Sequence, residues 1–70
     1  MIQYQPVTSS NISSVGYDAD KGELRVRFAS GKEYGYLGVR PEQHAALIGA
    51  PSVGQHFTQH IRPHYSGIPV

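Results

Sequence analysis

The sequence predicts an α+β domain, a three-stranded antiparallel β-meander followed by two short helices packed on one face (β-β-β-α-α). Two observations carry this prediction. In the first half of the chain, apolar residues alternate with polar ones, which is typical of half-buried strands. After Gly38 the apolar spacing becomes helical, and Pro41 and Ser52 mark two helix starts. Helices that follow a sheet in sequence and cover one of its faces form an α+β arrangement.

The composition restricts the class of protein. A chain of 70 residues with 39% hydrophobic residues is typical of one small globular domain. It contains no cysteine, which excludes disulfides and thiolate metal sites. The formal net charge of +1 allows only a modest electrostatic attraction to nucleic acid. No apolar run approaches the ~20 residues that span a membrane, and the N-terminus lacks signal-peptide features, so we expect a cytoplasmic protein without membrane contact.

The expected boundaries follow the turn-forming residues. Residues 1–10 are polar and contain Pro6, so we expect a flexible N-terminal arm there. Residues 11–65 then form a single domain without an internal repeat. Residues 66–70 contain glycine and proline and are expected to be an irregular C-terminal tail.

Three segments have the alternation of strands, and turn-forming residues separate them. Asp20 and Gly22 provide turn chemistry after the first segment, and Ser30 and Gly31 provide it after the second. The second strand is the most regular, because its apolar residues all face one way and its charged residues the other. The three segments read NISSVGYD, ELRVRFA and KEYGYL.

The two helices have recognisable starts and ends. Pro41 suits the first position of a helix that reads PEQHAALI and ends at Gly49. Ser52, followed three residues later by a glutamine, forms a capping box for a second helix from Val53 to about Arg62. The apolar residues of this second helix recur every four positions and form one stripe: Val53, Phe57 and Ile61.

Tyr34 and Tyr36 lie one residue apart, and the length of the preceding turn decides which face of the sheet they occupy. With a two-residue turn, both rings share the outer face with Arg25 and Arg27 and form a stacking platform. With a three-residue loop ending in a left-handed Gly31, both rings join the apolar inner face. We favour the second arrangement, because a two-residue turn requires a positive φ at a serine. The predicted core is then Val15, Tyr17, Leu24, Val26, Phe28, Tyr34, Tyr36, Leu47, Ile48, Val53, Phe57 and Ile61.

Three blocks of the sequence, in this order, resemble the KTSC domain family over about residues 7–65. The blocks are SSNISSVGYD, LRVRFASGKEYGYLGV and SVGQHFTQHIR, and Tyr34 and Tyr36 match the Tyr-x-Tyr signature of the family. The family is named for its occurrence at the C-terminus of some lysyl-tRNA synthetases, and it also occurs as free-standing short proteins. The resemblance therefore implies RNA, and tRNA first, as the partner. It carries no catalytic residues, and the tail HYSGIPV departs from the basic, aromatic tail frequent in the family.

The candidate RNA-contacting residues combine cations with aromatic rings. Cations bind phosphates, and both guanidinium planes and aromatic rings stack on unpaired bases. Against this, Glu23 and Glu33 are interspersed with the arginines, which is equally typical of a neutral, solvated face. The predicted nucleic-acid-binding set is Arg25, Arg27, Lys32, Tyr34, Tyr36 and Arg62.

The sequence offers little support for metal binding or catalysis. His56 and His60 have the spacing of two metal ligands on a helix, with His44 or His64 as a third, but a polar surface row is the simpler interpretation. Nucleophile elbows, phosphate-binding glycine loops and paired core carboxylates are absent from the sequence. We therefore expect a non-enzymatic binding domain with no cofactor, no metal and no small-molecule substrate.

Protein interaction is the alternative function. Both outer strands of a three-stranded meander carry unpaired backbone groups, which allows a partner or a second copy to add a strand. The polar face of the second helix is another candidate contact surface, because Gln55 and Gln59 lie on it beside the histidines.

Overall fold

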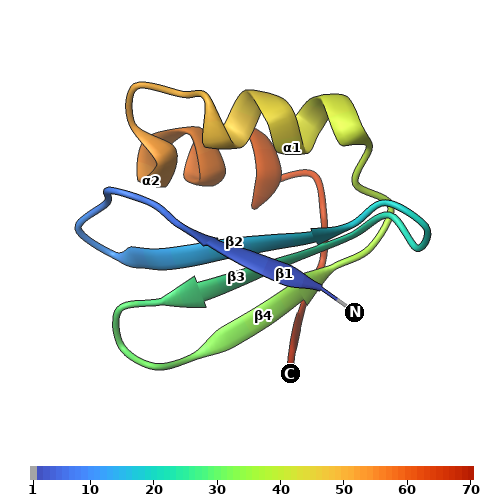
Figure 1. Ribbon diagram of the computed structural model, residues 1–70, viewed down its shortest axis with the longest axis horizontal. Coiled ribbons are helices and arrows are strands. Elements are labelled where there is room, and N and C mark those ends of the chain that lie inside the picture. Colours follow the sequence, from blue (N-terminus) through green and yellow to red (C-terminus); the bar gives the residue numbers. More distant parts are fainter. Residues whose placement is uncertain (1) are drawn as a thin grey trace.

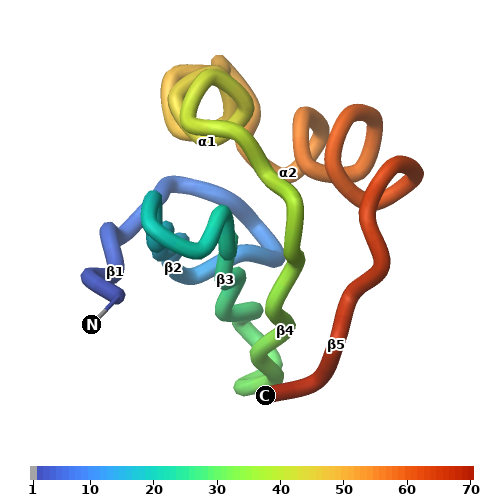
Figure 2. Tube along the Cα trace, turned by 90° about the vertical axis from the view of Figure 1, so that its right-hand side faces the viewer, coloured from blue at the N-terminus to red at the C-terminus, as the bar shows by residue number. Residues whose placement is uncertain are grey.

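A five-stranded antiparallel sheet with the helices on one of its faces makes up the structure, a computed structural model that describes residues 2–70 (Figure 1). The strands follow one another in space as they do in sequence, so the whole sheet is a meander. Figure 2 shows the helical layer on one side of this sheet. The elements are β1 (Gln3–Pro6), β2 (Ile12–Asp18), β3 (Glu23–Phe28), β4 (Glu33–Tyr36), α1 (Pro41–Ile48), α2 (Val53–His56), the π-helical segment η1 (Phe57–Ile61) and β5 (Gly67–Pro69).

The predicted α+β class is confirmed, but the predicted number of three strands is wrong, because the sheet has five. The two additional strands are β1, which pairs with β2, and β5, which pairs with β4. Strand β1 lies within residues 1–10, where we expected a flexible arm, and β5 lies within residues 66–70, where we expected an irregular tail. Met1, the first residue of the expected arm, is outside the described residues. Each is short and contains a proline, so neither has the alternation that reveals a strand. Proline is tolerated there because both are edge strands.

The hairpin between β3 and β4 has the favoured three-residue loop. Gly31 has a φ of +96°, and the Phe28 amide donates to the Lys32 carbonyl at 2.8 Å. Val26 therefore opposes Tyr34, and the next inner-face pair is Leu24 with Tyr36. The predicted register is confirmed, and both tyrosines lie on the face that the helices cover.

The second helical segment combines an α-turn with a π-turn. Ser52 caps it as predicted, since its hydroxyl accepts from the Gln55 amide at 3.4 Å. The Arg62 amide donates to the Phe57 carbonyl at 2.9 Å, five residues back. An α-helix has 3.6 residues per turn, so apolar residues four apart would rotate off the core face by about 80° over two repeats. The wider π-turn keeps the stripe facing the sheet, and such turns frequently occur at functional sites.

The core lies between the sheet and the helices. Every predicted core residue is either buried or packed against the buried cluster. A bulge between Ile12 and Ser14 returns Ile12 to the inner face, where its exposed fraction is 1%. No helix in residues 2–70 is both long and apolar enough to cross a membrane. The residues that join this core without having been predicted are Val7, Ile12, Val39 and Tyr65.

Candidate nucleic-acid interface

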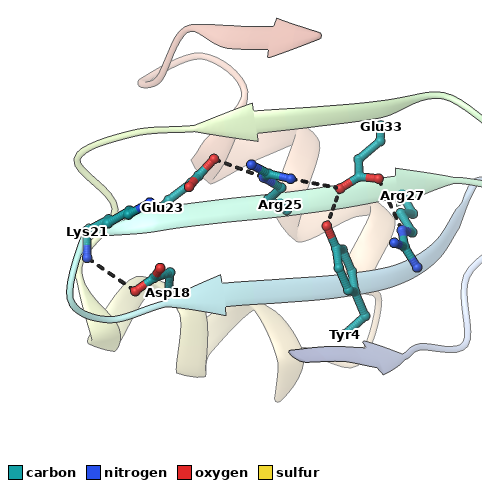
Figure 3. Close-up of polar contacts among 7 residues, drawn as sticks. All are labelled: Tyr4, Asp18, Lys21, Glu23, Arg25, Arg27 and Glu33. Carbon is teal, nitrogen blue, oxygen red and sulfur yellow. Dashed lines mark hydrogen bonds and ion pairs between the residues drawn. The ribbon is translucent and has the colours of Figure 1, made fainter. Parts of the chain in front are cut away.

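The six predicted RNA-contacting residues fall on opposite faces of the sheet. Arg25 and Arg27 lie on the outer face, which the helices leave uncovered, where Figure 3 shows them beside Glu33. The other four lie on the helix-covered side and line one cleft: Lys32, Tyr34, Tyr36 and Arg62. The structure therefore divides the predicted set into two groups on opposite faces of the sheet.

The two outer arginines are held in ion pairs. Arg25 Nε lies 2.9 Å from a Glu23 carboxylate oxygen, and its Nη1 lies 3.7 Å from Glu33. Arg27 Nε lies 3.1 Å from the other carboxylate oxygen of Glu33. A hydrogen bond to Glu23 raises the pKa of the Arg25 guanidinium, and a hydrogen bond to Tyr4 contributes less in the same direction. The outer face thus pairs its two cations with two carboxylates, which agrees with the neutral, solvated alternative considered from the sequence.

Tyr4 completes this outer network from β1 (Figure 3). Its hydroxyl donates to the Glu33 carboxylate, and the Arg27 guanidinium carbon lies 3.6 Å from the centre of its ring. The hydrogen bond from the Tyr4 hydroxyl lowers the pKa of Glu33 below its usual value, and the Arg27 guanidinium makes a smaller contribution in the same direction. Gly16 leaves room for the ring, because a Cβ there would lie 3.1 Å from Tyr4 Cδ2. The ring therefore covers part of the surface that the arginines would present to RNA.

The cleft on the other side of the sheet encloses about 680 Å³ and is rich in aromatic rings. Tyr36 and Phe57 are almost fully buried, with exposed fractions of 5% and 3%, and their centroids are 5.4 Å apart at an interplanar angle of 76°. Phe28 extends this edge-to-face packing to Phe57 and Tyr34, at centroid distances of 5.8 and 6.0 Å. Such pairs fix the rings beyond simple burial, by ~0.5–1.5 kcal/mol each. The aromatic lining of the cleft is Phe28, Tyr34, Tyr36, Phe57 and Tyr65.

Two exposed cations accompany these rings. Lys32 follows the β3–β4 loop, and Arg62 follows η1, so they approach the cleft from different elements. Burial raises the pKa of the Tyr36 hydroxyl, and the charge of Arg62 opposes that rise. The positive field of Arg62 therefore reaches the aromatic lining. A cleft of this kind can stack a planar ring and pair its attached anion.

Comparison with known proteins agrees with the sequence resemblance. The family model of the KTSC domain matches residues 8–65. The chain belongs to the KTSC domain family. An uncharacterized protein of Stutzerimonas stutzeri (strain A1501) is 47% identical over 58 residues, which cover 81% of this chain and 82% of that protein. A protein of Tsukamurella paurometabola is 36% identical over 64 residues, which cover 91% of this chain and 96% of that protein.

A solved structure extends the likeness to the entire fold. The crystal structure of a KTSC domain protein from Yersinia pestis is similar to this chain with a TM-score of 0.96 and 36% identity. The match covers 100% of this chain and 99% of that one. The edge strands β1 and β5 therefore fall within the part of the fold that this KTSC domain has in common with a relative.

The histidines of this KTSC domain are not arranged as a three-ligand metal site. The rings of His56 and His60 have centroids 4.6 Å apart. Burial lowers the pKa of His56, and the charge of His60 lowers it further. His44 instead stacks on Tyr17 at 4.7 Å and 11°, and burial lowers its pKa. Within residues 2–70, no three His, Cys, Asp or Glu side chains come together as metal ligands. His56 and His60 therefore form a pair without a third ligand.

Several residues around the cleft were not predicted from the sequence. Tyr65 is one, although it continues the four-residue repeat of Phe57 and Ile61 beyond Pro63, and its amide donates to the Ile61 carbonyl at 3.1 Å. That repeat was the signal that would have identified it. Gly67 is another, and it lies so close to Tyr36 that a Cβ would be 2.9 Å from the ring. No local pattern predicts such a contact, because it joins residues from two strands.

Proposed function

We propose that this KTSC domain is a small non-enzymatic domain that binds single-stranded RNA in the aromatic cleft. One observation carries the proposal, namely that five aromatic residues and two exposed cations from separate elements line the same hollow of about 680 Å³. Single-stranded bases stack on aromatic side chains and their phosphates pair with Lys and Arg, whereas paired bases are not free to enter such a cleft. Tyr34, which is only half-buried, contributes stacking surface, whereas Tyr36 is almost fully buried and forms part of the rigid floor of the cleft. Lys32 and Arg62 bind the flanking phosphates.

Transfer RNA is the ligand to test first. The sequence resemblance associates the family with the C-terminus of some lysyl-tRNA synthetases, and tRNA offers unpaired bases in its loops and at its 3′ end. Unpaired positions of this kind are the usual targets of sequence-specific RNA recognition. The proposal therefore concerns the single-stranded parts of tRNA and not its helical stems.

The four cleft residues are better candidates than the two outer arginines. Arg25 and Arg27 lie 2.9–3.7 Å from the carboxylates of Glu23 and Glu33, so a phosphate approaching them meets two negative charges as well. Lys32 and Arg62 are exposed, and within residues 2–70 they take part in no ion pair. We therefore assign the phosphates to the cleft side of the molecule.

The experiment compares three double variants in binding to a tRNA pool and to single-stranded oligoribonucleotides. Lys32→Ala with Arg62→Ala is expected to weaken binding about fivefold or more at low salt, the loss of two partly exposed charge contacts. Lys21→Ala with Arg40→Ala removes the same charge from exposed positions outside the cleft and is expected to change affinity much less. Fluorescence anisotropy and the ¹⁵N–¹H spectrum report affinity and folding together.

The third variant places the competing surface in the same assay. Arg25→Ala with Arg27→Ala also removes two cations, but from the outer network. If this variant weakens RNA binding more than the cleft variant does, while its spectrum stays folded, the cleft assignment is wrong and the outer face binds the RNA. If wild-type protein binds neither tRNA nor oligoribonucleotide at low salt, the RNA proposal itself fails.

Protein interaction is the second candidate, and one observation favours it. Leu37, Ile68 and Val70 are exposed at 56%, 52% and 57%, and Ile68 lies opposite Gly35 on the β4–β5 edge. The edges first considered, β2 and β4, are instead covered by β1 and β5. A partner would add its strand to β5, whose short length and proline make it a poor template. If the spectrum of the protein does not change when RNA is added, protein interaction at the β5 edge becomes the favoured function.

A further inference from the structure

We infer that the RNA groove continues from the aromatic cleft into a neighbouring hollow lined by amides, which reads the edge of the adjacent base. This inference rests on the proposed function and names the part of the ligand that gives sequence preference. The second hollow encloses about 480 Å³. It is lined by Ser9, Ser10, Asn11, Ser52, Gly54, Gln55, Thr58 and Gln59.

The two hollows share part of their walls. Ser10, Asn11 and Thr58 line both, so the aromatic cleft and the amide hollow adjoin along the β1–β2 loop and η1. In Figure 1 this loop and α2 lie at the same end of the sheet as the β3–β4 loop. A ligand that leaves the aromatic cleft on that side therefore enters the amide hollow without crossing another element.

The linings of the two hollows differ in chemistry. The aromatic cleft contains rings and two cations, whereas the amide hollow is lined by amides, hydroxyls and a glycine and by no charged side chain. Cations bind phosphate without regard to sequence. An amide carries a donor and an acceptor side by side, which matches the paired donor and acceptor on a base edge. The second hollow is thus suited to a base and not to a phosphate.

Asn11 is held in place through its side-chain oxygen. Its Oδ1 accepts from the Ser9 hydroxyl at 3.0 Å. A Cβ on Gly54 would lie 2.8 Å from this Oδ1 and 2.9 Å from the Ser9 oxygen, so glycine allows the pair to rest on the helix. Thr58 is fixed similarly, because its hydroxyl donates to the Gly54 carbonyl at 2.9 Å. These contacts orient the shared wall before any ligand binds.

The expected ligand is therefore at least a dinucleotide, with one base stacked and its neighbour hydrogen-bonded. Asn and Gln side chains make bidentate hydrogen bonds most readily with adenine, through its amino group and N7. Gln55 and Gln59 are exposed in the hollow and free to adapt to that edge. We expect oligoadenylate to bind more tightly than oligouridylate.

The test measures the affinities of six-nucleotide oligoadenylate and oligouridylate for three proteins. Wild type is expected to prefer oligoadenylate by about fivefold or more, the discrimination of a good bidentate contact. Gln55→Ala with Gln59→Ala is expected to lose that preference while still binding oligouridylate. Gln3→Ala with Gln5→Ala removes two exposed glutamines from β1 and is expected to retain it.

The outcomes separate this inference from the proposed function. If wild type binds both oligonucleotides equally, or if the Gln55/Gln59 variant keeps the preference, the amide hollow is not a base site. The RNA-binding proposal survives that result provided that Lys32→Ala with Arg62→Ala still weakens binding. If wild type binds neither oligonucleotide nor tRNA, the proposed function fails first and the inference falls with it.

Discussion

Tyr4 joins residues of two distant strands through a single side chain. From β1 its hydroxyl reaches Glu33 on β4, and its ring receives the Arg27 guanidinium of β3 (Figure 3). The cation–π contact is worth ~0.5–1 kcal/mol at an exposed site. Glu33 is the centre of this network, because it accepts from Tyr4 and pairs with both arginines. The carboxylate of Glu33 on β4 therefore links the edge strand β1 to β3 and β4.

The first prediction concerns that charge. Glu33→Gln is expected to lower the free energy of unfolding at pH 7 by about 1 kcal/mol, the upper range for exposed ion pairs. Folding lowers the pKa of Glu33, so its stabilisation is complete above the ordinary glutamate pKa of about 4.3 and is lost as the pH falls through the lower folded value. Urea unfolding at pH 7 and pH 3 should show the variant and wild type converging in acid.

Asp20→Asn is the matched control for this experiment. Asp20 is exposed in the β2–β3 turn, where asparagine is also a favoured residue. The unfolding midpoint of the Asp20→Asn variant should therefore equal that of wild type at both pH values. Coincident curves for Glu33→Gln and wild type from pH 7 to pH 3 would show that the carboxylate adds nothing to stability, and a constant offset would show that its contribution does not come from its charge.

The outer network also shows which part of the site prediction sequence alone could supply. The alternation of strand β3 places Arg25 and Arg27 on one face, and this part of the prediction needs only local periodicity. Their pairing with Glu33 depends on the register across the hairpin. Tyr4 lies 29 positions from Glu33 and reaches it only because β1 joins the sheet. The three-residue loop places Arg27 opposite Glu33, and the structure confirms this pair, but no pattern along the chain predicts that Tyr4 joins it.

At the scale of elements, β5 closes one wall of the aromatic cleft. Its Gly67 pairs with Tyr36 and lines the cleft, while Figure 2 shows the chain descending from the helical layer to run beside β4. The absence of a side chain at position 67 allows the buried Tyr36 ring to approach the strand. The position of β5 and the position of the ring therefore depend on each other.

The second prediction tests this dependence. Gly67→Ala would place a Cβ 2.9 Å from Tyr36 Cε2 and 3.0 Å from its hydroxyl oxygen, so either the ring or the strand must move. We expect a loss of about 1–3 kcal/mol of stability, typical of overpacking, and shifts of the β4 and β5 amides. Ser66→Ala, an exposed neighbour, is the control for urea unfolding and for the ¹⁵N–¹H spectrum. An unchanged Gly67→Ala spectrum would mean that β5 does not set the ring.

The elements that were predicted correctly are those with a local signal. Strands β2 to β4 have alternation and loop glycines, and α1 has Pro41 at its start, so their bounds and most of their register follow from neighbours in sequence. The exception is the bulge between Ile12 and Ser14, which no local pattern indicates. Strands β1 and β5 have only four and three residues and a proline each. They are strands because an unpaired edge is next to them, which is a property of the assembled sheet. The π-turn of η1 likewise follows from burial of the stripe against the sheet.

For the whole molecule, the cleft assembles at one end of the sheet from segments distant in sequence. The β1–β2 loop, the β3–β4 loop, η1 and the residues before β5 all contribute to its lining. Lys32, Tyr34 and Tyr36 were predicted together because they are neighbours in sequence, but Arg62 joins them only through packing of η1 on the sheet. With a formal net charge of +1, this KTSC domain has little general attraction for RNA, so the proposed RNA binding would depend mostly on specific contacts.

The last prediction follows from that small charge. If Lys32 and Arg62 meet two phosphates, the logarithm of the association constant should fall with the logarithm of salt concentration at a slope of about −1.4, which is −0.7 for each phosphate of a single strand. Affinity would then weaken about sevenfold between 50 and 200 mM salt. The slope should approach zero for Lys32→Ala with Arg62→Ala, and should keep its wild-type value for Lys21→Ala with Arg40→Ala. A slope of about −3 or steeper would require cations beyond the cleft, with Arg25 and Arg27 the first candidates. RNA binding that ignores salt altogether would mean that Lys32 and Arg62 pair with no phosphate, because a phosphate contact releases counterions.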